Sequence, residues 1–212
     1  MKQKWLAVPL LAAVLLVGSH TSSNVIQYFQ RQPLDLSRPP ADVPFDLRVK
    51  NYWGGSCYHA STQVALRWAD KGAVADNWRN TYGHGASTWD IARVLDHYKI
   101  PYKRTQHSGQ GANENGDIRV LDYAHNHRLV AAITYYPEHA ISFLGWVQKD
   151  GKEYACLLDN NRINDFIFVE KSTFLWNWRN KYSGGAIVPL VKAPPPKPYN
   201  PHDYLVEREN EE

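Results

Sequence analysis

The stretch Gly54-Gly-Ser-Cys-Tyr-His-Ala-Ser61 decides how this chain is interpreted, because it places a cysteine directly after two glycines and a serine. The residues from Cys57 to about position 70 predict an amphipathic helix, with Ala60 and Val64 on the same face as the cysteine. A thiol in the first turn of a helix lies beside unpaired backbone N–H groups and the positive end of the helix dipole. Both lower its pKa, and the N–H groups can donate to an oxyanion. The glycines let the backbone approach the group that the sulfur attacks. The stretch therefore predicts a nucleophilic cysteine.

Length and composition predict one globular domain with extensions at both ends. The chain has 212 residues, a net charge of +3 and 21% charged residues, and its Lys and Arg residues form no cluster. Binding to nucleic acid requires a basic face, so nucleic acid is excluded as a partner. The sequence contains no metal-ligand spacing such as His-Glu-x-x-His and no glycine-rich phosphate loop. We therefore expect no metal and no cofactor.

The N-terminus predicts export. Residues 1–22 begin with the basic run Met1-Lys-Gln-Lys4 and continue with a mostly apolar segment over residues 5–18, which is typical of a signal peptide. The apolar segment is shorter than the roughly 20 residues that span a bilayer comfortably. Cleavage near Val17-Gly-Ser19 would release the rest of the chain, whereas an uncleaved segment would attach it to the membrane through residues 5–18. Either alternative places the domain outside the cytoplasm, as a secreted, periplasmic or membrane-anchored protein.

Composition shifts divide the rest of the chain. Residues 23–43 are polar and rich in proline, and they predict a linker. Residues 44–191 predict the folded domain. Residues 192–212 contain a proline-rich segment and then charged residues, so we expect an extended or disordered tail there.

The order of the predicted elements indicates an α+β domain with an antiparallel sheet, since helices come first and strands follow. Ser87 is a predicted helix N-cap because Asp90 follows it by three residues, and residues 149–152 predict a hairpin turn. We expect helices over residues 57–70, 88–98 and 117–127, and strands over residues 129–135, 140–147, 154–158, 166–169 and 186–190.

A nucleophilic thiol needs a base, and His139 is the preferred candidate among nine histidines. It begins the apolar run that predicts the strand from residue 140, so its side chain can face a cleft at the strand's edge. His84, which is flanked by glycines, is the main competitor. His59 lies two residues after Cys57 and so faces a different side of the helix.

A third group should orient the imidazole, and Asp159 is the preferred candidate, followed by Asn160. Both residues end the strand that follows His139, so they can lie beside it on the adjacent strand. The same polar residues are also common in an ordinary turn, because asparagine tolerates left-handed backbone. Both interpretations remain open on the sequence.

A disulfide is the alternative role for Cys57. An exported chain with two cysteines favours a bridge, here between Cys57 and Cys156. Cys156 lies in the apolar run Tyr154-Ala-Cys-Leu-Leu158 and is better interpreted as a small buried hydrophobic residue. A bridge between the two would exclude catalysis by Cys57.

The run Gly55-Ser-Cys-Tyr-His-Ala-Ser61 resembles the active-site motif of papain-like cysteine peptidases, and the order of cysteine, histidine and acidic residue is also theirs. The compact spacing, with Leu158-Asp-Asn-Asn161 and then Phe174 and Trp178, looks most like the group of bacteriocin-leader-processing (double-glycine) peptidases. The resemblance covers roughly residues 45–190. It implies a papain-like α+β fold in which an N-terminal helical part, with a central catalytic helix, packs on an antiparallel sheet. It also implies a Cys-His-Asp triad.

The resemblance further implies a side-chain donor to the oxyanion, and here the chain departs from the family. The family carries glutamine six residues before the cysteine, whereas this chain carries Asn51, which has the same donor on a shorter side chain. Asn51 can equally be the first residue of a turn. Trp53 and Tyr58 flank the cysteine, and together with Asn160 they are the predicted substrate-binding residues. Aromatic residues at such places also commonly belong to the core.

These observations predict an exported papain-like thiol hydrolase that cleaves a peptide or amide bond through an acyl-enzyme on Cys57. The predicted catalytic residues are Cys57, His139, Asp159 and Asn51, and the partner is a peptide or protein substrate. The alternative is a catalytically weak or inactive papain-like domain, which would act as a secreted or particle-associated binding module. The sequence does not indicate the oligomeric state or the cleavage specificity.

Overall fold

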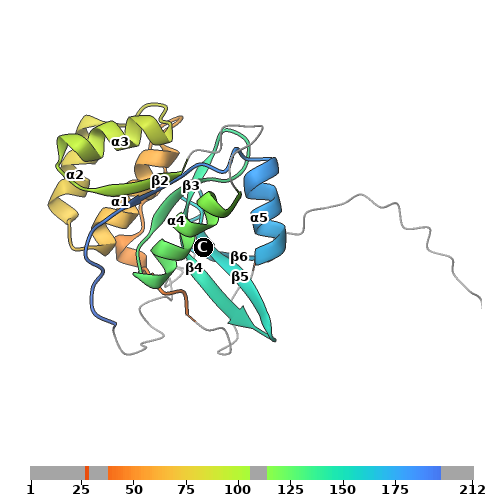
Figure 1. Cartoon of the computed structure of the whole chain (residues 1–212). Coiled ribbons are helices and arrows are strands. Elements are labelled where there is room, and N and C mark those ends of the chain that lie inside the picture. Colours follow the sequence, from red (N-terminus) through yellow and green to blue (C-terminus); the bar gives the residue numbers. More distant parts are fainter. Residues whose placement is uncertain (1–26, 29–37, 106–113, 197–212) are drawn as a thin grey trace, which may run out of the picture.

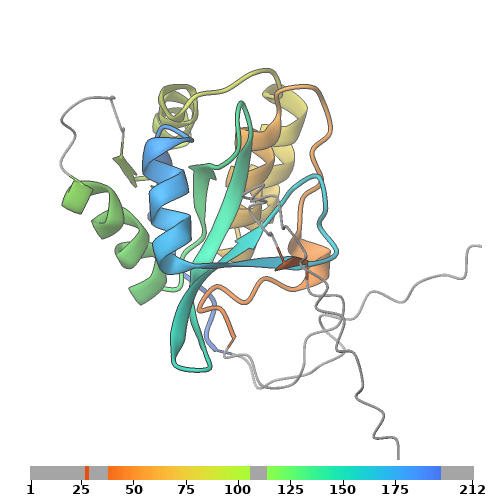
Figure 2. The ribbon, with the colours of Figure 1, turned by 90° about the vertical axis from the view of Figure 1, so that its right-hand side faces the viewer.

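The computed structural model describes residues 27–28, 38–105 and 114–196, and they form a sheet with helices on both faces (Figures 1 and 2). In chain order, the described elements are β1 (Gln27–Tyr28), the 3-10 helix η1 (Phe45–Leu47), α1 (Cys57–Trp68), α2 (Gly72–Thr81), α3 (Thr88–His97), β2 (Tyr102–Thr105), α4 (Glu114–Asn126), β3 (Ala131–Thr134), β4 (Ala140–Lys149), β5 (Lys152–Leu158), β6 (Phe166–Glu170), α5 (Lys171–Asn180) and β7 (Ala186–Pro189).

The strands form one sheet in the order β1-β6-β5-β4-β3-β7-β2, and every neighbouring pair is antiparallel. The prediction of an α+β domain with an antiparallel sheet is therefore confirmed. The register pairs Thr134 with Ala140 and Ser142 with Leu158. It follows that the residue before β4 and the residues after β5 meet at the same end of the sheet.

Helix α1 is the buried centre of the fold. Every residue of α1 except Arg67 is buried. One side of the helix packs on β3, β4 and β7, and α2 and α3 cover the other. A helix that is buried all round needs small and apolar side chains, which Ala60, Val64 and Ala65 supply. This packing fixes the position of the helix and of its first residue, Cys57.

The strands alternate between two cores, as expected for a sheet that is covered on both faces. On β3, Ala132 faces the α1–α3 side, whereas Ile133 faces the side covered by α4 and α5. An aromatic cluster lies on this second side, where Phe143 of β4 packs against Phe174 of α5 with ring centroids 6.0 Å apart. Figure 2 shows α4 and α5 on one side of the sheet and α1 on the other.

Most predicted elements are confirmed to within a few residues. Ser87 caps α3 in a capping box with Asp90, and residues 149–152 make the β4–β5 hairpin turn with positive φ at Asp150 and Gly151. The predictions were wrong in omitting the short β1 and η1 as well as α2, β2 and α5. Helix α2 buries only Ala75 and Trp78, too few positions to mark a helical apolar stripe in the sequence. Strand β2 has four residues, too few for a distinct alternation.

The folded part begins earlier than predicted. Ala41 and Val43 were placed in the linker, but both are fully buried, and the backbone N–H of Ala41 donates to the carbonyl of Leu144 at 3.0 Å. Gly145 has a φ of +126°, and a side chain there would collide with the ring of Pro40. This close approach explains the glycine. The predicted signal or anchor segment, residues 1–22, lies outside the described residues, as does the tail from residue 197.

Within the described ranges, no helix combines the length and apolar character needed to span a membrane.

Candidate active site

The loop before α1 is built around Ser56. Its side-chain oxygen accepts hydrogen bonds from the backbone N–H groups of Tyr52, at 3.2 Å, and Trp53, at 3.0 Å, and its hydroxyl contacts Asn51. Gly55 has a φ of +82°, and a Cβ at this position would lie 3.1 Å from the backbone of Gly85. The serine and the second glycine of the motif are therefore required by the shape of the turn that delivers Cys57 to the start of α1.

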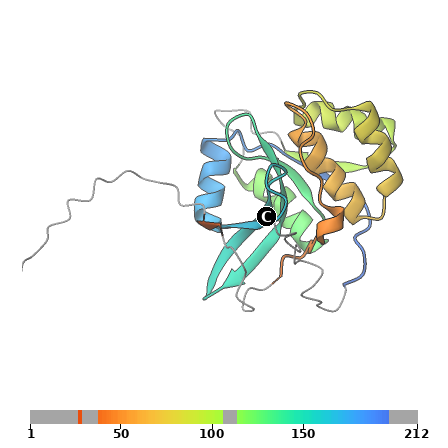
Figure 3. The ribbon, with the colours of Figure 1, turned by 180° about the vertical axis from the view of Figure 1, so that it is seen from behind.

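His139 is held by the tight connection between β3 and β4. The backbone N–H of Tyr135 donates to the carbonyl of His139 at 3.0 Å. Tyr136 and Glu138, within this connection, have left-handed φ values of 77° and 55°. Such backbone is costly for residues other than glycine and persists only where the surrounding structure enforces it. The connection and the loop before α1 lie at the same end of the molecule (Figure 3).

Asp159 orients His139. It follows β5, and its Oδ1 lies 2.9 Å from Nε2 of His139 and accepts the backbone N–H of Asn161 at 2.8 Å. Because Nε2 is directed at the carboxylate, Nδ1 is the ring nitrogen left for the thiol. The ring of Tyr136 packs beside the imidazole, with centroids 6.3 Å apart. The sequence left Asp159 and Asn160 open as orienting residues, and the structure places Asp159 in that position.

The environment of Cys57 favours a thiolate. Burial alone raises the pKa of the Cys57 thiol, but hydrogen bonds from the His139 side chain and from the backbone N–H of Ala140 outweigh it. The positive charge of the imidazolium and the N–H of Tyr58 act in the same direction, so the pKa lies below its ordinary value.

The pKa values of His139 and Asp159 shift in opposite directions, and both shifts favour the charged form. Burial alone lowers the pKa of His139, but hydrogen bonds to Asp159 and Cys57 outweigh it and raise that pKa to about 9. For Asp159, burial is outweighed by the hydrogen bonds from His139 and Asn161, which lower the pKa of the carboxyl group. The three shifts therefore all act toward the charged forms, a thiolate, an imidazolium and a carboxylate.

Asn160 has a different role from the one predicted. Its side chain is buried, and its Nδ2 lies 3.0 Å from the carbonyl oxygen of Cys57, 3.0 Å from Oγ of Ser61 and 2.8 Å from the carbonyl oxygen of Ala140. The prediction that Asn160 contacts substrate is therefore wrong for this structure, because the amide faces inward. Asn160 instead ties the first turn of α1 to the start of β4, which keeps Cys57 beside His139. The polar triple after Leu158 marked Asn160 as a candidate site residue, but the sequence did not show in which direction its side chain points.

Asn51 lies between the loop before α1 and the loop after β5. Its backbone N–H donates to the carbonyl of Asn160 at 2.7 Å, and its Nδ2 donates to Oδ1 of Asn161 at 3.2 Å. The side-chain oxygen contacts the hydroxyl of Ser56. An amide nitrogen carries two hydrogens, so Asn51 keeps one donor beyond the bond to Asn161.

The two aromatic residues predicted to contact substrate lie in different places. Tyr58 is buried, its hydroxyl lies 2.5 Å from Oγ1 of Thr134, and burial raises the pKa of the phenol, so the prediction that it lines a groove is wrong. A Cβ at Gly185 would meet both hydroxyl groups, which explains that glycine. Trp53 is 49% exposed and stacks on the ring of His84, with centroids 5.1 Å apart.

The structure bears on the remaining candidates as well. Cys57 and Cys156 are both free thiols, so the disulfide alternative is not what the structure contains. Cys156 lies in the core on β5. His84, the competing base, packs on Trp53, whereas His139 interacts with the thiol. In the part of the chain that the structure describes, no group of three or more His, Cys, Asp or Glu side chains is placed to hold a metal ion.

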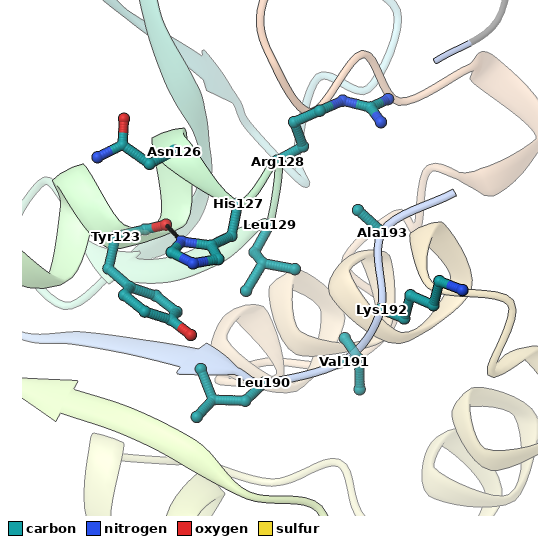
Figure 4. A pocket seen from close by; sticks show the side chains of 9 residues that line it. All are labelled: Tyr123, Asn126, His127, Arg128, Leu129, Leu190, Val191, Lys192 and Ala193. Carbon is teal, nitrogen blue, oxygen red and sulfur yellow. Dashed lines mark hydrogen bonds between the residues drawn. The ribbon is translucent and has the colours of Figure 1, made fainter. Parts of the chain in front are cut away.

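Two surface cavities lie elsewhere. A cavity of about 490 Å³ lies between the end of α4 and the segment after β7, and Figure 4 shows Tyr123, His127 and Leu190 among its lining residues. A smaller one, of about 320 Å³, is lined by Tyr52, Trp53, Arg79 and Asn80 beside the loop that leads to Cys57. Cys57 and His139 line neither cavity.

No protein-family model matches the sequence, and no curated protein matches it. The chemistry of the site is therefore argued from its geometry.

Proposed function

We propose that this protein is an exported papain-like thiol hydrolase that cleaves a peptide or amide bond through an acyl-enzyme on Cys57. The observation that carries the proposal is the interaction of Cys57 with His139, whose Nε2 lies 2.9 Å from Asp159. A buried thiol with a lowered pKa beside an imidazole with a raised pKa is the electrostatic arrangement that an activated cysteine needs. The predicted helical part and central helix are consistent with α1 packing on the sheet.

The reaction proceeds in two steps. The Cys57 thiolate attacks the carbonyl carbon of the substrate, forming a C–S bond and an oxyanion. As the tetrahedral species collapses, the C–N bond breaks and the imidazolium of His139 gives its proton to the leaving amine. His139, now neutral, takes a proton from water, whose oxygen attacks the thioester. The carboxylic acid leaves, the C–S bond breaks, and the thiolate and imidazolium are restored.

The oxyanion requires donors that are in place before the reaction. The backbone N–H of Cys57, at the start of α1, is one. The amide hydrogen of Asn51 that is not bonded to Asn161 is the second, because the side chain is held at the entrance to the motif by Ser56 and Asn161. Asp159 holds the imidazole ring in the orientation that directs Nδ1 at the sulfur.

Export and the substrate class rest on the sequence. The basic and apolar segment over residues 1–18 supports export, and the motif around Cys57 supports a peptide or protein substrate. The α+β architecture does not select a substrate, because one fold carries many activities.

Alkylation by iodoacetamide under native, non-reducing conditions tests the proposal. We expect Cys57 to be labelled faster near pH 6 than an ordinary thiol, because its lowered pKa gives it a larger thiolate fraction, and we expect no labelling of Cys156 in the folded protein. Cys156 is the internal control, since its thiol is fully buried and burial raises its pKa. Mass spectrometry of the labelled peptides gives both rates. Labelling of Cys57 at the rate of an ordinary thiol contradicts the enzyme and supports the inactive binding module.

A further inference from the structure

His59 is a buried histidine that the proposed reaction does not use. It lies on α1 two residues after Cys57 and is 4% exposed. Nε1 of Trp78, on α2, donates a hydrogen bond to Nδ1 of His59 at 2.9 Å, and Trp78 is fully buried. An indole nitrogen can only donate, so Nδ1 must be the acceptor and the imidazole carries its hydrogen on Nε2. This bond fixes the tautomer of His59.

The other side of the ring faces the loop between α2 and α3. Burial lowers the pKa of His59, which agrees with a neutral ring, and a hydrogen bond with the backbone of His84 acts in the opposite direction. Because Nδ1 accepts from Trp78, Nε2–H is the donor that the ring offers to this backbone, whose partner atom is then the carbonyl oxygen. His59 therefore connects the start of α1 with the loop of residues 82–87.

That loop packs directly on the loop that delivers Cys57. The ring of His84 stacks on Trp53 with an interplanar angle of 15°. A side chain at Gly83 would overlap the Trp53 ring, with a Cβ only 2.2 Å from it, and Gly55 packs against Gly85. In addition, the hydroxyl of Tyr52 donates to the carbonyl of Tyr82 at 3.0 Å. The two loops thus form one wall, of which the exposed Trp53–His84 stack is the outer edge.

We propose that His59 is a positioning residue that locks residues 82–87 onto the loop before α1 and so holds the Trp53–His84 stack as a rigid substrate-facing wall beside Cys57. The bond to Trp78 sets the tautomer, and that tautomer supplies the donor for the His84 carbonyl. The wall binds the flanking residues of a peptide substrate through aromatic faces. Its effect on catalysis rests on the proposed function, whereas the lock itself does not.

Two single-residue replacements separate the two hydrogen bonds. Asparagine places its polar atoms near the position of Nδ1, so His59→Asn keeps an acceptor for Trp78 and loses the donor to His84. Glutamine reaches the position of Nε2, so His59→Gln keeps the donor and loses the acceptor. Each variant loses one hydrogen bond of a buried pair, which makes them a matched comparison, and urea unfolding of both confirms that each is folded.

Backbone amide order parameters of Gly83, His84 and Gly85, measured by NMR, test the lock. We expect values of about 0.85 in the wild type and in His59→Gln, and values below about 0.6 in His59→Asn. Order parameters that stay high in His59→Asn, or that fall equally in both variants, overturn the proposal.

Kinetics provide the second measurement. For a peptide that the wild type cleaves, we expect KM to rise about tenfold in His59→Asn and to stay within about twofold in His59→Gln, as for the loss of one positioning contact. Alkylation of Cys57 by iodoacetamide should stay within about twofold in both, because the reagent is too small to use the wall. An equal rise of KM in both variants overturns the proposal. Slow alkylation of the wild type contradicts the proposed function alone and leaves the order-parameter result to decide on His59.

Discussion

The two cysteines of this chain have the same side chain, yet their thiol pKa values shift in opposite directions. Cys57 begins α1 and Cys156 lies in the middle of β5, and both are buried free thiols. Burial works against the thiolate at both positions, yet the pKa of Cys57 is lowered and that of Cys156 is raised. The difference lies in the neighbours. Cys57 meets an imidazole and two backbone N–H groups, whereas Cys156 is surrounded by apolar side chains.

A helix start and its surroundings thus lower the pKa of a buried thiol, whereas a strand interior raises it. The proposed reaction at Cys57 depends on three separate supports: the partner His139, the oxyanion donors near Asn51, and the clamp of Asn160 that holds the elements together. Removing each support in turn should change a different part of the contrast between the two cysteines, and Cys156 is available each time as the reference.

Removal of His139 should have the largest effect. In His139→Ala, burial of Cys57 is no longer opposed by the imidazole, so its pKa should rise. Loss of the acid and base should lower kcat by about 10²–10⁴. The pH dependence of iodoacetamide labelling measures the thiol directly, and its inflection should move toward alkaline pH. An unchanged inflection would show that His139 does not activate Cys57.

Substitution of Asn51 should distinguish formation of the thiolate, which labelling of Cys57 measures, from stabilisation of the oxyanion, which kcat reports. Asn51→Asp keeps the oxygen that contacts Ser56 and removes both amide hydrogens, so kcat should fall by about 10²–10³, as for the loss of one oxyanion donor. Labelling of Cys57 should change far less than kcat. Asn51→Gln, which restores the donor of the papain-like pattern, is the matched control and should retain more activity than Asn51→Asp. Equal losses in the labelling rate and in kcat would show that Asn51 does not act as a donor to the oxyanion.

The sequence predicted the parts of the site that depend on position along the chain. The glycine-serine-cysteine turn, the strand after His139 and the polar end of β5 are local signals, and the antiparallel register of β4 and β5 brings them together. The direction in which a side chain points is not local. Tyr58 and Asn160 were assigned to substrate because they adjoin the predicted triad, but the packing of α1 on β3 and β4 turns both inward.

The same limit applies to the fold. Helices α1 and α3 carry apolar faces or a capping box that a single sequence shows, whereas α2 is held by the burial of Ala75 and Trp78 against its neighbours. The link from His59 to Trp78 also joins two elements through side chains, so no spacing along the chain reveals it. Positioning contacts of this kind are visible only once the elements are packed.

The hydrogen bonds of Asn160 near Cys57 should contribute to the stability that keeps Cys156 protected. Asn160→Ala leaves the carbonyl groups of Cys57 and Ala140 buried without this donor, so the free energy of unfolding should fall by about 1–3 kcal/mol. Cys156 then reports the loss, because its labelling requires opening of the core and should accelerate by about 5–150-fold. Asn161→Ala, in the neighbouring and more exposed position, is the control and should leave Cys156 protected. Unchanged labelling of Cys156 in Asn160→Ala would show that the clamp does not stabilise the fold.

The smallest effect concerns stability against pH, and it follows from counting protons on the Cys57–His139 pair. The pKa of His139 is raised to about 9, so by itself the group contributes stability that is complete below about pH 6.5 and is lost as the pH rises through about 9. The pKa of Cys57 is lowered, so the stability that it contributes has the opposite pH dependence: it is complete above about pH 8.5 and is lost as the pH falls through the lowered pKa.

Within the interval from about pH 6.5 to pH 8.5, wherever the pH lies above the lowered pKa of Cys57, the folded pair holds one proton on His139 and the unfolded pair holds one on Cys57. The two contributions to the pH dependence cancel there, and the pair adds no slope. In Cys57→Ser the cancellation is lost, because the serine does not titrate. Asp159 still raises the pKa of His139, so the free energy of unfolding should decline over this interval in the variant. Urea midpoints at half-unit pH steps measure the difference, with Cys156→Ser as the control that should keep the wild-type profile. Parallel profiles for Cys57→Ser and the wild type would show that Cys57 and His139 do not exchange a proton as a pair.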